Sequence, residues 1–245
     1  MTLWSAAGGG RHPDGVEDGS LRMTSRLVPP RLMLLTDRAQ LSLGRGLLTT
    51  VRECVDAGLT WVVVREHDLG PAARAAVVER LAEIEGLTVI SSRVVDPSAA
   101  GVHLAAGQGV PGGAACNALL PRLTTRCNGA LDGITARYMG GAVPWGRSCH
   151  TVEEVRAAAD EGAAWATLSP YAATASKPGY GPALGPRPFE GPHDLPVFAL
   201  GGIDAGNAAE ARAAGAYGVA VMGAVMRAHD PASVIHDLLG AVGGA

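Results

Sequence analysis

The chain has 245 residues, of which 47% are hydrophobic, 18% are charged and 4% are aromatic, and its formal net charge is −3. This is enough for one sizeable core, whereas the weak charge and scarce aromatic residues argue against nucleic acid as the main partner. No apolar run reaches the ~18 residues of a membrane span. The four cysteines are far apart and form no Cys-x-x-Cys pair. We therefore expect a reduced, cytoplasmic protein without a disulfide framework or a zinc site.

Residues 1–29 are rich in Gly, Asp and Arg and have no hydrophobic period, so they predict a disordered leader. Met23 is a candidate for the true start, because every regular pattern lies after it. Residues 30–245 then form one domain. An insert at about 105–143 has weak periodicity, with a helix at 115–123 as one hypothesis.

From Arg31 onward, short apolar runs alternate with helical patterns rich in Ala and Leu. Strands are predicted near residues 32, 60, 87, 101, 144, 163, 195 and 216. Helices are predicted over 43–58, 70–86, 151–162, 207–215 and 231–242. The apolar runs are continuous rather than alternating, which is typical of parallel strands buried on both faces.

Eight strand units in a chain of this length predict a closed (β/α)8 TIM barrel, a fold of ~250 residues. The alternative is an open, doubly wound sheet. That fold needs a glycine-rich turn after the first strand, and the segment 34–40, "LLTDRAQ", does not provide one.

The active site of such a barrel is built where the strands end. The last two predicted strands end in Gly201-Gly202 and Met222-Gly223. Backbone N–H groups from both loops would converge on one phosphate, and we favour that interpretation over simple tight turns.

Two further strand ends carry groups suited to an anion. Arg65 and Glu66 follow the second strand, where an inward Arg65 would meet a carboxylate or phosphate and an outward one would form an ion pair at the rim. Thr174, Ser176 and Lys177 follow the sixth strand in a glycine-flanked loop. This loop is either a lid over an anionic substrate or an ordinary surface loop.

Thr151 and Glu154 form a capping box, which starts a helix at about Val152. His150 then lies just before the cap, at the mouth of the barrel. An imidazole titrates near neutral pH and suits proton transfer, although a structural role is the alternative. His103 lies in an apolar context and is interpreted as a packed core histidine.

Taken together, "TDR", "VREH", "GRSCHTVEEV", "LSPYAATASKPGYG", "FALGGI" and "AGAYGVAVMGAV" resemble the thiamine phosphate synthase family, which includes the thiazole tautomerases. The resemblance covers about 31–242 apart from the insert. It implies a (β/α)8 barrel enzyme of thiamine biosynthesis. The synthase joins a hydroxymethylpyrimidine diphosphate to a thiazole phosphate, with Mg²⁺ on the diphosphate.

The resemblance assigns roles to individual residues. Arg65 and Glu66 match an Arg-Glu motif, and Ser148 matches the serine before the histidine of the fifth strand. Matches to the diphosphate loop are Thr174, Ser176 and Lys177, and matches to the thiazole-phosphate cradle are Gly202, Met222 and Gly223.

The sequence also departs from the synthase pattern. Val63 and His67 replace a glutamine and a lysine, Ser91–Ser92 replace Asn-Asp, and Gln108 replaces a second aspartate. Both carboxylates expected to bind Mg²⁺ are therefore missing, and Mg²⁺ sites normally use one or two.

The tautomerases lack these carboxylates too and share Gly-Arg-Ser-x-His, which is Gly146–His150 here. We therefore predict a metal-independent isomerase of a carboxythiazole phosphate, with His150 as acid and base and Arg65 on the carboxylate. The alternatives are a Mg²⁺-dependent synthase and a non-catalytic protein that binds a thiazole phosphate. The expected partner is the phosphorylated thiazole, with no nucleic acid and no membrane. Homo-oligomerisation is left open.

Overall fold

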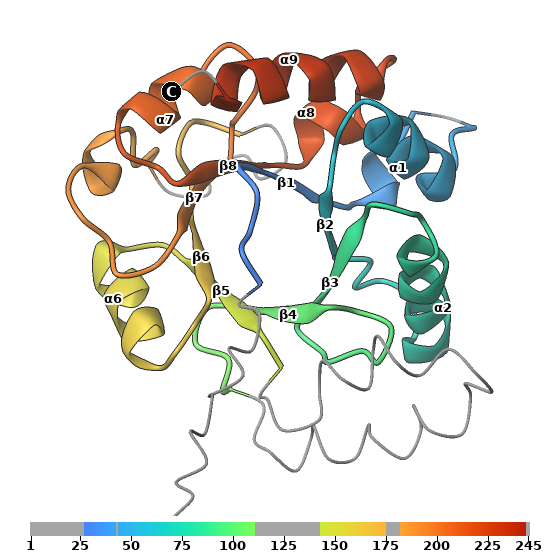
Figure 1. Cartoon of the computed structure of the whole chain (residues 1–245), viewed down its shortest axis with the longest axis horizontal. Helices are drawn as coiled ribbons and strands as arrows, with labels where there is room; N and C mark the ends of the chain where they lie inside the picture. Colours follow the sequence, from blue (N-terminus) through green and yellow to red (C-terminus); the bar gives the residue numbers. More distant parts are fainter. Residues whose placement is uncertain (1–26, 43, 111–142, 175–181, 244–245) are drawn as a thin grey trace, which may run out of the picture.

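The computed structural model describes residues 27–42, 44–110, 143–174 and 182–243. Eight parallel strands pair in sequence order, and the last pairs with the first to close a barrel (Figure 1). The predicted (β/α)8 barrel is therefore confirmed, and the alternative of an open sheet is wrong.

Every strand lies where an apolar run predicted it. The strands are β1 Leu32–Leu35, β2 Trp61–Val64, β3 Thr88–Ser92, β4 Gly101–Leu104, β5 Trp145–Cys149, β6 Trp165–Leu168, β7 Val197–Leu200 and β8 Gly218–Val221.

Helices ring the barrel on its outside (Figure 1). They are α1 Leu47–Asp56, α2 Pro71–Ala82, α6 Val152–Asp160, α7 Ala208–Ala213, α8 Gly223–Met226 and α9 Pro231–Gly243, with 3-10 turns η1 Arg38–Gln40 and η2 Arg187–Phe189. The sequence did not predict α8, η1 or η2, because three or four residues are too few to show a helical period. No helix in the described ranges is long and apolar enough to cross a membrane.

The strands are buried on both faces, which explains why their apolar runs are continuous. In β1, Leu32 and Leu34 pack with the helices outside the barrel, whereas Met33 and Leu35 belong to the inner cluster. That inner cluster also contains Trp61, Val63, Ile90, Trp165 and Phe198.

The capping box before α6 forms much as predicted. The Thr151 hydroxyl accepts from the N–H of Glu154 at 3.2 Å, and the Glu154 carboxylate accepts from the N–H of His150 at 2.6 Å. The helix starts at Val152. Both bonds fix the backbone of His150 where β5 opens onto the barrel mouth.

The start of the described chain crosses the end of the barrel before β1 (Figure 1). Leu27 packs against the inner cluster, and the buried Pro29 accepts a hydrogen bond from the Tyr217 hydroxyl at 2.6 Å. These contacts hold three residues that the sequence assigned to the leader. The rest of the predicted leader and residues 111–142 of the insert lie outside the described residues.

Candidate active site

A cavity of about 930 Å³ opens at the carboxyl ends of the strands. This is the end at which barrel enzymes place their active sites. Of the predicted site residues, the cavity brings together Arg65, Ser148, His150, Thr174, Gly202, Met222 and Gly223. Ser176 and Lys177 lie outside the described residues.

Alternation along β2 and the residues after it decides which side chains reach the cavity. Successive side chains of an extended chain point to opposite faces. Accordingly Arg65 and His67 line the cavity, whereas Glu66 between them does not. Glu66 is 3% exposed, and its carboxylate accepts from the Arg38 N–H at 3.2 Å and faces the Arg38 Nε at 3.5 Å. Glu66 thus holds the loop after β1 rather than facing the cavity.

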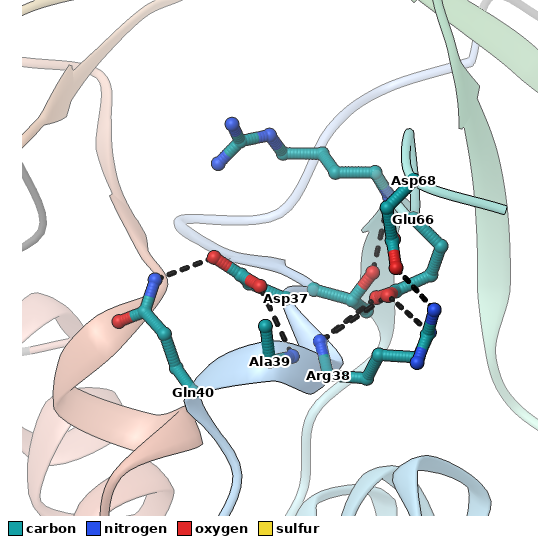
Figure 2. Close-up of polar contacts among 8 residues, drawn as sticks. Asp37, Arg38, Ala39, Gln40, Glu66 and Asp68 are labelled. Atoms are coloured by element: carbon teal, nitrogen blue, oxygen red, sulfur yellow. Dashed lines mark hydrogen bonds and ion pairs between the residues drawn. The ribbon is translucent and has the colours of Figure 1, made fainter.

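Figure 2 shows the ion pairs of this loop. The Arg38 guanidinium bridges Glu66 and Asp68. The Asp37 carboxylate accepts from the Ala39 N–H at 3.2 Å and from the Gln40 amide at 2.5 Å. The rim ion pair that was one interpretation of Arg65 is therefore formed by Arg38 instead.

Arg65 is one of the cations that line the cavity. Its backbone N–H donates to the Thr36 hydroxyl at 3.0 Å, and its guanidinium Nη1 lies 2.7 Å from the Met222 sulfur across the barrel mouth. Burial lowers the pKa of Arg65, while the nearby Asp37 raises it. An arginine remains charged in either case. Arg93 lines the same side and has a left-handed backbone, with φ of 66°.

The pKa of His67 shows how positive the cavity is beside Arg65 and Arg93. Its Nε2 lies 3.0 Å from the Ser92 hydroxyl. Burial, followed by the charges of Arg93 and Arg65, lowers the pKa of His67 to about 4. His67 is therefore neutral near pH 7, and the surroundings disfavour an added positive charge.

The residues at the expected metal positions do not fit a protein-held Mg²⁺. Ser92 is bonded to His67, and the Ser91 hydroxyl donates to the Val94 carbonyl at 2.6 Å. The Gln108 amide donates to the Arg93 carbonyl at 2.6 Å and thereby closes a loop. Within the described ranges, no group of three His, Cys, Asp or Glu residues could hold a metal ion. Neutral oxygens beside two arginines are a poor set of Mg²⁺ ligands.

The glycines after β7 are required by the backbone. Gly201 and Gly202 have φ of 93° and 67°, and a Cβ on Gly202 would lie 2.5 Å from the Ala173 carbonyl oxygen. The Asn207 amide donates to the Gly202 carbonyl at 2.8 Å and fixes the turn. A tight turn and a ligand-facing loop therefore coincide at Gly202.

The loop after β8 lines the cavity next to this turn, because β7 and β8 are neighbouring strands. Gly223 starts α8, and the Arg227 guanidinium lies where a Cβ on Gly223 would be. Arg227 also lines the cavity and bonds to the Gln40 side chain. We name Gly202, Gly223 and Arg227 the glycine end of the cavity. Met222 lies between this end and Arg65, whose guanidinium Nη1 is 2.7 Å from the Met222 sulfur. Arg65 and Arg93 form its arginine end.

The side chains of β5 and the residue after it also alternate between the cavity and the outside of the barrel. Ser148 and His150 line the cavity, whereas the Arg147 guanidinium bonds to Glu161 at 2.9 Å and to the Gln108 carbonyl at 3.0 Å. The arginine of the Gly-Arg-Ser-x-His motif is therefore structural.

His150 is held in one tautomer. Its Nδ1 lies 2.9 Å from the Ser169 carbonyl oxygen. A carbonyl only accepts, so Nδ1 carries the proton and the neutral ring has its lone pair on Nε2. A lone pair held this way on a cavity-lining histidine can take a proton from a substrate.

Sequence reasoning missed part of the cavity. Arg93, Arg227 and Ser92 were given no site role, and His103 was interpreted only as a core residue. His103 is 3% exposed, but it lines the cavity and its Nε2 lies 3.0 Å from the Ser148 hydroxyl. Strand parity would have found it, because His103 is the inward residue near the end of β4.

The closed barrel surrounds a cavity lined by three arginines and two glycine-containing loops, an arrangement typical of (β/α)8 enzymes that bind phosphate. The family model described as "Thiamine monophosphate synthase" matches residues 135–225. A "Putative thiamine-phosphate synthase" of Geobacter sulfurreducens is 34% identical over 219 residues, which cover 85% of this chain and 92% of the relative. The thiamine-phosphate synthase of Salinispora tropica is 32% identical, covering 86% and 97%.

Among solved structures, a thiamine phosphate pyrophosphorylase from Pyrococcus furiosus is similar, with a TM-score of 0.66 at 22% identity over 87% of this chain and 95% of that one. This likeness shows the fold. The chain belongs to the thiamine phosphate synthase family, and it is an enzyme of thiamine biosynthesis. The resemblance found in the sequence is confirmed. The names of the relatives favour the synthase alternative over the isomerase that we predicted first.

Proposed function

We propose that the chain is a thiamine phosphate synthase that joins a hydroxymethylpyrimidine diphosphate to a thiazole phosphate. The observation that carries the proposal is one cavity of about 930 Å³ with an arginine end and a glycine end. Two phosphorylated substrates need two such sets of groups in one cavity. The near full-length likeness to relatives named as synthases supports the same assignment.

The arginine end suits the diphosphate. When the substrates join, the bond between the pyrimidine methylene carbon and the diphosphate breaks, and pyrophosphate leaves with the electron pair. The lone pair of the thiazole nitrogen forms the new bond to that carbon. Arg65 and Arg93 line the cavity where they can stabilise the departing negative charge. The residues at the expected metal positions do not fit a protein-held Mg²⁺, and Arg65 and Arg93 supply the positive charge at this end.

The glycine end suits the thiazole phosphate. Gly202 and Gly223 both line the cavity, and Arg227 adds a cation beside Gly223. Backbone N–H groups together with an arginine are a common way to hold a phosphate. Ser148 and His150 lie on the cavity wall between the loops and would contact the rings or their substituents.

The variant Arg65→Gln tests the proposal. It removes the inward charge and keeps a polar side chain, so we expect kcat/KM for pyrophosphate release to fall by about 10²–10³-fold. The matched control is Arg52→Gln, an exposed arginine of α1, which should leave the rate unchanged. An Arg65→Gln enzyme with the wild-type rate would show that the arginine end does not serve the reaction.

A second candidate is isomerisation of a carboxythiazole phosphate. Two observations favour it: the metal carboxylates are replaced, and His150 lines the cavity with its Nδ1 2.9 Å from the Ser169 carbonyl oxygen. A proton shift needs one acid–base group and a held phosphate, but no diphosphate and no metal. A protein that binds a thiazole phosphate without turning it over is the remaining outcome.

A further inference from the structure

A chain of three polar groups, of which Trp165 and His103 are buried and Ser148 is partly exposed, runs through the inner layer of the barrel. The Trp165 indole Nε1 lies 3.1 Å from His103 Nδ1, and His103 Nε2 lies 3.0 Å from the Ser148 hydroxyl oxygen. Trp165 and His103 are at most 3% exposed, and their rings stack at an interplanar angle of 14°. The chain ends at the cavity, which Ser148 lines.

The donors and acceptors of this chain have one consistent assignment. An indole N–H only donates, so His103 Nδ1 must accept and cannot carry a proton. The neutral ring therefore carries its proton on Nε2, which donates to Ser148. The Thr167 hydroxyl lies farther from the same nitrogen, at 3.4 Å.

Burial makes this assignment stable. A protonated His103 would place an Nδ1–H against the Trp165 N–H, two donors facing each other. Burial, with a smaller effect of the Arg65 charge, lowers the pKa of His103 to about 3. The ring is therefore neutral, with one tautomer, throughout the range in which enzymes of this kind are assayed.

Sequence and packing hold the indole in place. A Cβ on Gly146 would collide with the Trp165 ring, so the glycine of the Gly-Arg-Ser-x-His motif makes room for it. Trp61 meets Trp165 edge to face, with ring centroids 5.5 Å apart. Two residues of the motif therefore serve this chain. Gly146 leaves space for the indole, and Ser148 accepts the last hydrogen bond of the chain.

We propose that Trp165 and His103 are positioning residues that fix the Ser148 hydroxyl as a hydrogen-bond donor aimed into the cavity. The Ser148 oxygen accepts from His103, so its own proton points away from His103 and toward the cavity. Ser148 would then donate to an acceptor atom of the bound substrate. This last step rests on the proposed function, whereas the tautomer of His103 does not.

The tautomer is measured first, on the ligand-free full chain. In protein with ¹⁵N-labelled histidine, long-range ¹⁵N–¹H spectra should show His103 with an unprotonated Nδ1 and a protonated Nε2. In Trp165→Phe, which removes only the indole N–H and some ring volume, the Nδ1–H tautomer should become populated. The matched control is Trp61→Phe, because the buried Trp61 Nε1 has no hydrogen-bond partner in the described structure. That variant should keep the wild-type tautomer.

Binding is measured next by calorimetry, with the thiazole phosphate and the hydroxymethylpyrimidine diphosphate titrated separately. The ligand that loses affinity in Ser148→Ala should lose the same factor, about tenfold, in Trp165→Phe. The double variant should lose no more than either single variant, because both remove one interaction. Trp61→Phe should bind as the wild type does.

Two sets of results would overturn the inference. The first is a wild-type His103 that is protonated or carries its proton on Nδ1. The second is Ser148→Ala that binds both ligands normally, or Trp165→Phe that binds normally where Ser148→Ala does not. A wild-type protein that binds neither ligand would instead overturn the proposed function, and the spectra would still decide the orientation of the chain.

Discussion

At the scale of single residues, the parity of a strand decides what each motif residue does. In Arg65-Glu66-His67 the first and third residues line the cavity and the second holds the rim. In Gly146–His150, Ser148 and His150 face the cavity while Arg147 faces Glu161. Neighbouring residues of one motif therefore have different roles: some line the cavity, and others hold the surrounding loops and helices in place.

His103 gives a prediction of pH dependence. Its folded pKa of about 3 lies below the value of about 6.5 expected in the unfolded chain. As pH falls below about 6.5, the unfolded state gains a proton that the folded state does not, so the free energy of unfolding decreases. Above that pH this contribution is fully present.

The measurement is urea unfolding at about pH 6.5 and about pH 5, for the wild type and for His103→Gln. Glutamine can accept from Trp165 and donate to Ser148, but it does not titrate. We expect the wild type to lose about 1–2 kcal/mol more than the variant over this range. Equal losses would mean that His103 titrates normally in the folded protein.

At the scale of elements, contacts outside the cavity hold the loop after β1 in place. Glu66, from the end of β2, binds the backbone and side chain of Arg38 in η1, and Asp37 caps that turn through the Ala39 N–H (Figure 2). The loop in turn carries Gln40, which bonds to Arg227 of the glycine end. An ion pair outside the cavity thus connects three strand ends.

Glu66→Ala tests this supporting role. Removing the buried carboxylate leaves the Arg38 N–H without its acceptor, so we expect a loss of about 1–2 kcal/mol in unfolding free energy. Because Glu66 does not line the cavity, kcat should fall far less than in Arg65→Gln. The control Glu83→Ala removes an exposed ion pair with Arg80 and should cost at most about 0.5 kcal/mol. A stable Glu66→Ala enzyme without activity would restore the catalytic role predicted from the sequence.

The elements could be predicted well from the sequence because a barrel strand is buried on both faces and is therefore a continuous apolar run. Seven of the predicted site residues also line the cavity, since polar residues after strands gather at one end of a barrel. The sequence could not give His103 its role, because Trp165 lies 62 residues away and the hydrogen bond between them appears only in the fold. The outward direction of Glu66, in contrast, follows from side-chain alternation beyond the end of β2, a signal that the sequence does contain.

At the scale of the whole molecule, barrel closure brings the first and last strands together, so residues at or after the ends of all eight strands line the cavity. The arginine end comes from segments after β2 and β3, and the glycine end from the loops after β7 and β8. These two ends lie in one cavity, with Ser148 and His150 from β5 and its end on its wall. This arrangement is what a reaction between two phosphorylated substrates requires.

The most direct test is pyrophosphate release by the wild-type protein from hydroxymethylpyrimidine diphosphate and thiazole phosphate, first with Mg²⁺ and then with a chelator. The proposed function predicts release together with formation of thiamine phosphate. If a folded protein releases none under either condition, the synthase assignment is wrong. Isomerisation of a carboxythiazole phosphate that His150→Ala abolishes, with ligand binding retained, would then identify the second candidate.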